Sequence, residues 1–250
     1  MSITANVLYR DSFYFFRNKL GSILIIVLLT AFISVSLNHF LGNDTEMLKI
    51  LGTIKGDFAT STSLSIQEFI NQITPEQQII LLQASAAATF SALVGKALLV
   101  SGVLTLLRLV SQGQCPSMLS VIGASIPVLP RLMIMLFICS LLIQLGIRLL
   151  VVPGVIMALA FSLSSVIMTT DQKGILASIK SSYKMAFDNV RIIAPAMIIW
   201  LVAKLLILLI FSYLPSFVPN ITNLVFTTLS NLISTLLLIY LFRLYMLLRS

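Results

Sequence analysis

Long apolar runs, separated by short stretches that carry most of the charge, constrain this chain more than any other feature of its sequence. A bilayer core of about 30 Å needs roughly 20 apolar residues per helix, and the chain contains five predominantly apolar runs of that length or more. Only 10% of its 250 residues are charged, which is too few to cover a water-exposed body of this size. Because unpaired backbone groups are not tolerated in lipid, each run must be helical. The sequence therefore predicts an all-α, polytopic membrane protein that forms one membrane domain over residues 1–250.

The five runs predict six transmembrane helices. One run, residues 132–168, is too long for a single helix and contains Val152-Pro153-Gly154, where proline can begin a helix and glycine loosens the backbone. We interpret this run as a hairpin of two spans, of which the second, from about residue 153 to 168, is the shortest. The other four spans are predicted at residues 20–41, 79–107, 192–214 and 221–242.

Basic residues set the predicted orientation, because lysine and arginine beside transmembrane helices stay in the cytoplasm. An even number of spans places both termini on one side. Eleven basic residues fall on that side, whereas the other side has only Lys49 and Lys55. Both termini are therefore predicted to be cytoplasmic, with the loop of residues 42–78 outside. The eleven are Arg10, Arg17, Lys19, Arg108, Arg131, Lys173, Lys180, Lys184, Arg191, Arg243 and Arg249.

Three segments on the side of the termini have the periodicity of amphipathic helices, and we expect them to lie in the membrane interface. Their predicted apolar faces are Leu8, Tyr9, Phe13, Phe16 and Leu20 in residues 3–20, Leu119, Ile122 and Ile126 in residues 117–126, and Ile175, Ile179, Tyr183, Phe187 and Val190 in residues 171–191. Each segment precedes a pair of spans. This order indicates either three repeated units, 3–110, 116–170 and 172–250, or the short amphipathic connectors that any polytopic protein uses.

The net charge of +8 is predicted to face anionic lipid rather than nucleic acid. A basic residue near an anionic membrane surface contributes about 1 kcal/mol. Nucleic-acid binders interleave aromatic residues with a basic groove, and the sequence has no such pattern. The residues predicted to contact lipid headgroups are Arg10, Arg17, Lys173, Lys180, Lys184 and Arg191.

The second span is predicted to begin outside the membrane. Thr74-Pro75-Glu76-Gln77 is typical of a helix start, with threonine as N-cap, proline in the first turn and glutamine reaching back. A helix from Pro75 to about residue 110 would be roughly 54 Å long, so it would project beyond the lipid. Apolar residues at 64, 66, 69, 70 and 73 also predict a short helix that rests on the outer surface.

Three cations lie inside the predicted spans, Lys96, Arg148 and Lys204, and no aspartate or glutamate accompanies them there. Charge in lipid is costly and normally faces a partner or water. Arg148 is near the outer end of its span and can extend to the headgroups. Lys96 is near the bilayer midplane, so we expect it to face the bundle interior and to donate hydrogen bonds to Asn231, Ser230 or Thr227. Candidate ligand or lipid residues are therefore Lys96, Lys204, Arg148 and Asn231.

Small and polar residues recur along two of the predicted spans and favour close helix packing over a permeation path. In the second span these residues are Ala88, Ala92, Ser91 and Gly95. In the sixth span they are Asn220, Asn223, Thr227, Ser230 and Ser234, with Asn231 and Thr235 beside them.

Residues for catalysis are scarce, and we predict that the protein is not an enzyme and holds no metal or other cofactor. His39 has no cysteine or carboxylate at metal-ligand spacing. Cys115 and Cys139 form no CxxC pair. No histidine or carboxylate within a span could activate a serine, and no glycine-rich phosphate loop is present.

Several stretches resemble one bacterial family over nearly the whole chain. They include Met1-Ser2-Ile3-Thr4-Ala5, Tyr9-Arg10-Asp11, Phe15-Phe16-Arg17-Asn18, Pro75-Glu76-Gln77-Gln78 and Tyr240-Leu241-Phe242-Arg243-Leu244-Tyr245-Met246. The family is the YciC family of uncharacterised enterobacterial inner-membrane proteins. The resemblance implies a multi-pass inner-membrane protein and brings no catalytic residue with it. We expect a role in membrane organisation or envelope homeostasis through anionic lipids, with a membrane-protein partner reached through the outer loop. The alternative is a transporter or lipid-moving protein for an anionic substrate.

Overall fold

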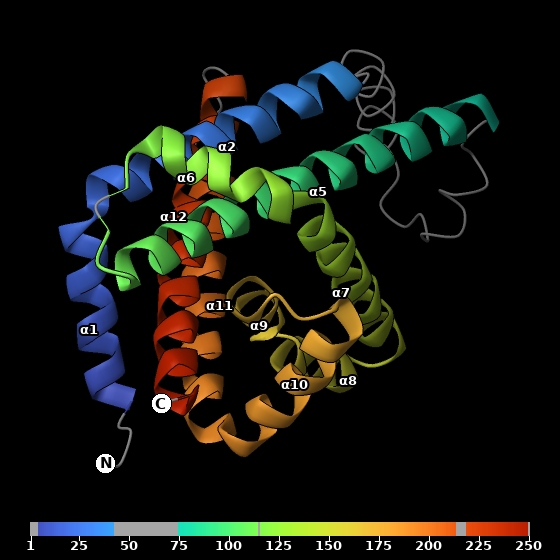
Figure 1. Cartoon of the computed structure of the whole chain (residues 1–250). Helices are drawn as coiled ribbons and strands as arrows, with labels where there is room; N and C mark the ends of the chain where they lie inside the picture. Colours follow the sequence, from blue (N-terminus) through green and yellow to red (C-terminus); the bar gives the residue numbers. More distant parts are fainter. Residues whose placement is uncertain (1–4, 43–74, 115, 214–218, 250) are drawn as a thin grey trace.

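The structure is a computed structural model, and it describes residues 5–42, 75–114, 116–213 and 219–249. Within these ranges every regular element is a helix (Figure 1). Six helical stretches of the described chain are long and apolar enough to cross a membrane, which confirms the predicted all-α class and number of spans. They are Leu20–Leu41, Pro75–Ser111, Met118–Leu149, Val151–Asp171, Val190–Tyr213 and Ile221–Arg249.

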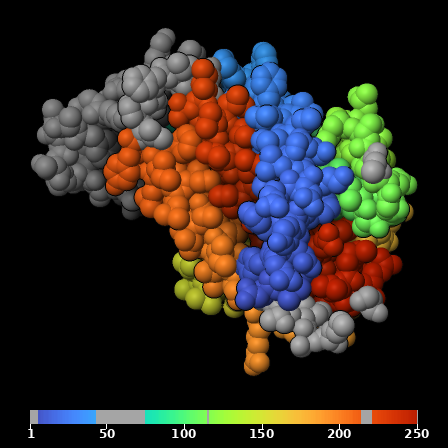
Figure 2. All heavy atoms as spheres, turned by 90° about the vertical axis from the view of Figure 1, so that its left-hand side faces the viewer, coloured from blue at the N-terminus to red at the C-terminus, as the bar shows by residue number. Residues whose placement is uncertain are grey.

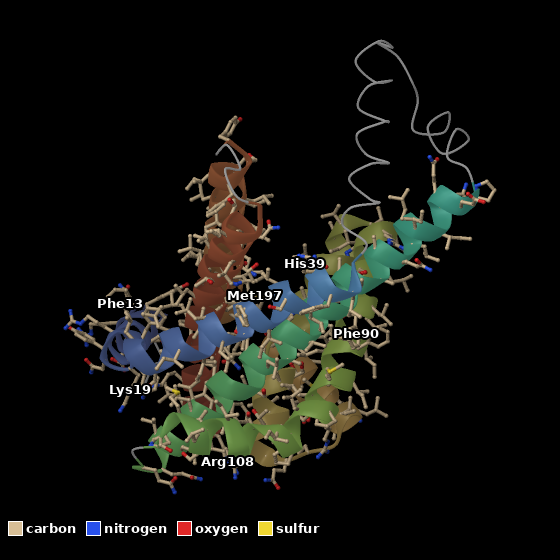
Figure 3. The ribbon with its side chains drawn as sticks, turned by 90° about the horizontal axis from the view of Figure 1, so that it is seen from above. Phe13, Lys19, His39, Phe90, Arg108 and Met197 are labelled. Atoms are coloured by element: carbon tan, nitrogen blue, oxygen red, sulfur yellow. The ribbon has the colours of Figure 1, made fainter. Side chains whose placement is uncertain are left out.

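Helices α2 (Leu20–Leu41) and α5 (Pro75–Ser111) lie side by side in an antiparallel pair. Figure 3 shows Lys19, before α2, and Arg108, in the last turn of α5, at the same end of the pair. α5 begins at Pro75 as predicted and extends beyond the end of α2 (Figure 1). The expected cap residue Thr74 and the expected outer-loop helix lie outside the described residues.

Small residues allow α2 and α5 to approach closely. A Cβ added to Gly95 would lie 2.7 Å from the Cβ of Ser34, so any larger residue would force the helices apart. Ser34 Oγ also donates a hydrogen bond to the carbonyl oxygen of Ser91 over 3.2 Å. The predicted small-residue packing is thus confirmed for Ser91 and Gly95. It is wrong for Ala88 and Ala92, which are exposed, because α5 turns a different face toward α2.

The predicted hairpin is present as α7 (Leu129–Leu149) followed by the broken pair α8 (Val151–Ala160) and α9 (Ser164–Asp171). Leu150 is extended between α7 and α8. Gly154 of α8 lies close to the last turn of α7, because a Cβ added to it would be 2.7 Å from the backbone nitrogen of Ile147. The stretch Val151–Asp171 is the shortest of the six, as expected. It is not one continuous helix, because the chain turns out of α8 at Phe161 before α9 begins.

The three predicted amphipathic segments are helices α1 (Ala5–Asn18), α6 (Met118–Ser125) and α10 (Ile175–Asp188). Their predicted apolar faces are only partly turned toward the protein. In α10 the buried residues are Ser178, Ser182 and Ala186, whereas Tyr183 and Phe187 are exposed. Likewise α1 buries Leu8 and Ser12 and exposes Phe13, and α6 buries Val121 and Ser125 and exposes Leu119. In α10 only small side chains are buried against the bundle, which allows this helix to approach it closely.

Helices α11 (Val190–Tyr213) and α12 (Pro219–Arg249) complete the bundle. The C-terminal half of α12 is central, since Leu238 to Phe242 are consecutively buried there. Helix α1 packs along this half, with the rings of Tyr9 and Tyr240 4.8 Å apart. Figure 2 shows α1 bordered by α11 on one side and by the last turns of α12 on the other. Both described ends of the chain lie at the same end of the bundle (Figure 1).

Candidate functional site

A groove with a volume of about 1150 Å³ lies where the end of α9, helix α10 and the last turns of α12 meet. These elements adjoin one another near the C-terminus in Figure 1. We call it the basic groove, because four cations and two acids form its charged lining. They are Lys173, Lys180, Lys184, Arg249, Asp171 and Asp188.

Asp171 fixes the floor of the basic groove. Its carboxylate, only 11% exposed, forms ion pairs with Lys173 Nζ at 2.9 Å and with Arg249 Nη1 at 2.8 Å. It also accepts a hydrogen bond from the hydroxyl of the buried Tyr245 at 2.8 Å. The contacts with Tyr245 and Arg249 join the end of α9 to the end of α12, and the ion pair with Lys173 lies within the turn that follows α9. Sequence reasoning missed Asp171, although an acid beside a long apolar run, among many cations, was a signal for it.

Arg131, in the first turn of α7, holds the turn that enters the groove. Its guanidinium donates to the carbonyl oxygen of Lys173 at 2.5 Å and to that of Gln172 at 3.4 Å. Gln172 has a φ of 53°, a left-handed conformation that is uncommon outside glycine. The two hydrogen bonds from Arg131 therefore help to stabilise this left-handed turn.

Lys180 and Lys184 differ from the other cations of the groove. They lie one turn apart on the exposed side of α10, and neither forms an ion pair with any residue that the structure describes. Between and beside them are the exposed rings of Tyr183 and Phe187, whose centroids are 4.7 Å apart. Two unpaired ammonium groups beside aromatic rings suit the boundary between phosphate headgroups and acyl chains.

The other predicted headgroup residues lie elsewhere. Arg10 is exposed and lines a second pocket, between α1, α11 and α12. Arg17 is exposed, with its guanidinium 5.6 Å from the ring centroid of Tyr14. Arg191 is exposed at the start of α11. The structure therefore brings Lys173, Lys180 and Lys184 into one groove and leaves these three arginines outside it.

Lys96 lies on α5 and Lys204 on α11, both within membrane-spanning helices. Lys204 Nζ is 4.9 Å from the ring centroid of Trp200. Lys96 is exposed and forms no hydrogen bond or ion pair within the described chain. The hydrogen bonds expected from Lys96 to Asn231, Ser230 or Thr227 are thus absent from the described chain, where the Lys96 side chain is exposed. Arg148 is exposed in the last turn of α7.

The polar face of α12 packs mainly on its own backbone. Thr227, Ser234 and Thr235 each donate a hydrogen bond to the carbonyl oxygen four residues earlier. One side chain of this face reaches another helix, since Asn231 Nδ2 donates to Thr30 Oγ1 of α2 over 3.5 Å. Asn231 therefore takes part in helix packing, as expected of such a stripe.

Groups for metal or nucleophilic chemistry are not brought together in the described part of the chain. No cluster of three or more histidine, cysteine, aspartate or glutamate side chains able to hold a metal occurs there. Cys139 is buried, with its Sγ 4.0 Å from Ser164 Oγ. His39 is exposed near the end of α2, and Cys115 lies outside the described residues.

Comparison with known proteins gives matches over the full length of the chain. The model of an uncharacterised protein family, UPF0259, matches residues 1–247. The chain belongs to this family. A UPF0259 membrane protein of Serratia proteamaculans is 66% identical to it over 250 residues, covering 100% of both chains. One of Yersinia pestis is 54% identical over 249 residues, covering 100% of this chain and 97% of its own. No solved structure matches.

Membership in UPF0259 confirms the resemblance to the YciC family, which is the same family in enterobacteria. The relatives are named membrane proteins, in agreement with the six apolar helices. The protein is therefore an integral, multi-pass membrane protein of an uncharacterised family to which no enzymatic activity is attached.

Proposed function

We propose that this UPF0259 protein is a non-enzymatic protein of the bacterial inner membrane that helps to organise the membrane by holding anionic lipid headgroups in the basic groove. Both termini, and the groove with them, face the cytoplasm in this proposal. Arginine and lysine outnumber acids on that side of the sequence, which supports the orientation.

The observation that carries the proposal is the pair Lys180 and Lys184. The two ammonium groups stand in an open groove without an ion-pair partner in the described chain, while the carboxylate of Asp171 is already shared by Lys173 and Arg249. Phosphate oxygens of a lipid would supply the missing negative charge. The exposed rings of Tyr183 and Phe187 would lie at the level where headgroups meet acyl chains.

Native mass spectrometry of the purified full chain tests this proposal. After gentle removal of detergent, the parent should retain phosphatidylglycerol or cardiolipin. A Lys180→Gln/Lys184→Gln variant should retain clearly less, whereas Lys180→Arg/Lys184→Arg, which keeps both charges, should retain as much as the parent. Arg108→Gln, in the last turn of α5 and outside the groove, is the control for the loss of a charge elsewhere on the same side of the protein. Equal retention by the glutamine variant would refute a headgroup role for the groove.

A second candidate function is movement of an anionic solute or lipid past Lys96 and Lys204. The observation that favours it is that both cations lie within membrane-spanning helices, Lys96 in α5 and Lys204 in α11. Reconstituted vesicles loaded with an anion-sensitive dye would show protein-dependent iodide entry that a Lys96→Met/Lys204→Met variant lacks. Identical dye signals from protein-containing and empty vesicles would count against anion conduction, and lipid scrambling can be tested in the same vesicles with a labelled anionic lipid.

A further inference from the structure

Unpartnered polar atoms gather in one place outside the basic groove. Five buried side-chain nitrogen or oxygen atoms of the described residues have no hydrogen-bond partner, and three of them belong to residues that line a single pocket. These are Tyr9 Oη, Ser12 Oγ and Trp200 Nε1. Buried polar groups nearly always have a partner, so a group of three without one indicates a ligand that supplies it.

The pocket lies between α1, α11 and α12, on the face shown in Figure 2, and has a volume of about 450 Å³. Tyr9, Arg10, Ser12 and Phe13 of α1, Trp200 of α11 and Tyr240 of α12 form its polar and aromatic part. The rest of its lining is aliphatic and comes from α11 and α12. We call it the inter-helix pocket. It shares no lining residue with the basic groove.

The hydrogen-bonding groups of the inter-helix pocket are donors. An indole N–H can only donate. Burial raises the pKa of Tyr9, so its hydroxyl stays protonated and able to donate at neutral pH. Ser12 is 2% exposed and its hydroxyl can donate as well. Tyr240 is already committed, because its hydroxyl donates to the carbonyl oxygen of Ile192 over 3.1 Å. Trp200 therefore requires an acceptor atom from a ligand, and an end rich in acceptor oxygens would also satisfy the hydroxyls of Tyr9 and Ser12.

The charge of the pocket lining limits the chemical class of the ligand further. Arg10 is the one charged residue of the lining, it is exposed, and it has no ion-pair partner among the residues described. A guanidinium at the edge of an apolar pocket favours a carboxylate or phosphate. The volume lies within the range of about 300–1,000 Å³ for sites that hold one small ligand. This leaves room for one acyl chain rather than for two chains with a headgroup.

We propose that the inter-helix pocket binds an amphiphile with a single acyl chain and an anionic, acceptor-rich end, with that end at Arg10 and the chain between α11 and α12. Two sources share this chemistry, a free fatty acid and a lysophospholipid. The proposal is independent of the role given to the basic groove, because the two sites have no residue in common.

The chain carries its own reporter for this site. Trp200 is the single tryptophan of the protein, and it lines the pocket. Bromine on an acyl chain quenches indole fluorescence on contact, so brominated ligands added to the purified full chain in neutral detergent report binding at Trp200. The probes are a brominated fatty acid, a brominated lysophosphatidylglycerol, a brominated diacyl phosphatidylglycerol and a brominated fatty alcohol.

Saturable quenching at one ligand per chain is expected with the fatty acid, the lysophospholipid or both, and the pattern identifies the source. The fatty alcohol should bind at least about tenfold more weakly, since it lacks the charge that Arg10 meets. Equal affinity for the alcohol would overturn the anionic end. Equal or tighter binding of the diacyl lipid would overturn the single chain. Quenching that rises in proportion to added probe without saturation would show partition into detergent and overturn the site.

Two variants locate the ligand. Arg10→Gln should weaken fatty-acid or lysophospholipid binding about tenfold, whereas Arg17→Gln, an exposed arginine of the same helix outside the pocket, should leave it unchanged. Ala203→Phe fills the aliphatic part and should abolish saturable quenching, while Ala92→Phe on the exposed side of α5 should not. Unchanged affinity in Arg10→Gln refutes the proposal. The Arg10→Gln variant tests the proposal even if Ala203→Phe does not fold, because Arg10 is exposed and its replacement should not disturb folding.

Discussion

Asp171→Ala should destabilise the end of the bundle that carries the basic groove. The substitution removes the acceptor of the hydrogen bond that the Tyr245 hydroxyl donates. Tyr245 is only 3% exposed, so its hydroxyl would be left buried without a partner. Leaving a buried hydroxyl unpaired costs about 1–3 kcal/mol. Lys173 and Arg249 lose their ion pairs as well, but their side chains are 46% and 55% exposed, so each pair is worth only about 0–1 kcal/mol. The expected loss in free energy of unfolding is therefore about 1–5 kcal/mol.

A double-mutant cycle separates the buried hydrogen bond from the exposed ion pairs. Tyr245→Phe removes the hydroxyl, so in the Asp171→Ala/Tyr245→Phe variant no buried donor is left unpaired. The double variant should be less destabilised than the sum of the single variants by about 1–2 kcal/mol. SDS-induced unfolding, followed by the fluorescence of Trp200, measures these free energies.

Asp188→Ala is the matched control for Asp171→Ala. Asp188 also lines the basic groove, but it is exposed and forms no ion pair within the described chain. Its removal should change the free energy of unfolding by less than about 0.5 kcal/mol. If Asp171→Ala were no more destabilising than Asp188→Ala, or if its effect simply added to that of Tyr245→Phe, the role assigned to the carboxylate would be wrong.

Four further predictions concern packing, charge and orientation. Gly154→Ala should sharply lower the yield of monodisperse protein in size-exclusion chromatography, because its methyl group would meet the α7 backbone. Gly123→Ala is the control, because an added methyl group there has open space around it; it should leave the yield unchanged and be neutral or stabilising by up to about 1 kcal/mol. Equal yields of the Gly154→Ala and Gly123→Ala variants would contradict the close approach of Gly154 to α7. Ser182→Ala should lower the free energy of unfolding in SDS by about 1 kcal/mol, because Ser182 Oγ donates a hydrogen bond of 2.6 Å to the carbonyl oxygen of Ala160 at the end of α8. An unchanged free energy of unfolding would show that this hydrogen bond does not stabilise the protein. Lys96→Leu should unfold at the same or higher SDS concentration, whereas strong destabilisation would reveal a partner for Lys96 beyond the described chain. Reporter fusions at the C-terminus should be cytoplasmic and those within residues 43–72 external; an external C-terminus would overturn the assigned orientation.

The number and order of the spans could be predicted because hydrophobic length is a local property of the sequence. The break between α8 and α9 could not, because Phe161, Ser162 and Leu163 include neither proline nor glycine, the residues that usually break a helix. What permits the break is distant in sequence, since Ser182 of α10 donates to the carbonyl oxygen of Ala160 near the end of α8. Pairing of Asp171 with Tyr245 and Arg249 is likewise a contact between segments more than 70 residues apart. Periodicity within one segment carries no information about such partners.

In the amphipathic helices, the periodicity of apolar residues predicts that a helix forms but not which of its faces packs against the protein. In a soluble protein an apolar face indicates the protein core, because water lies on the other side. At a membrane, lipid is as apolar as the core, so the same face can be turned either way. In α10 the buried side chains are Ser178, Ser182 and Ala186, while the exposed Tyr183 and Phe187 lie beside Lys180 and Lys184. In α10 small residues at spacings of four therefore mark the most deeply packed face, and periodicity of the large apolar residues alone does not identify it.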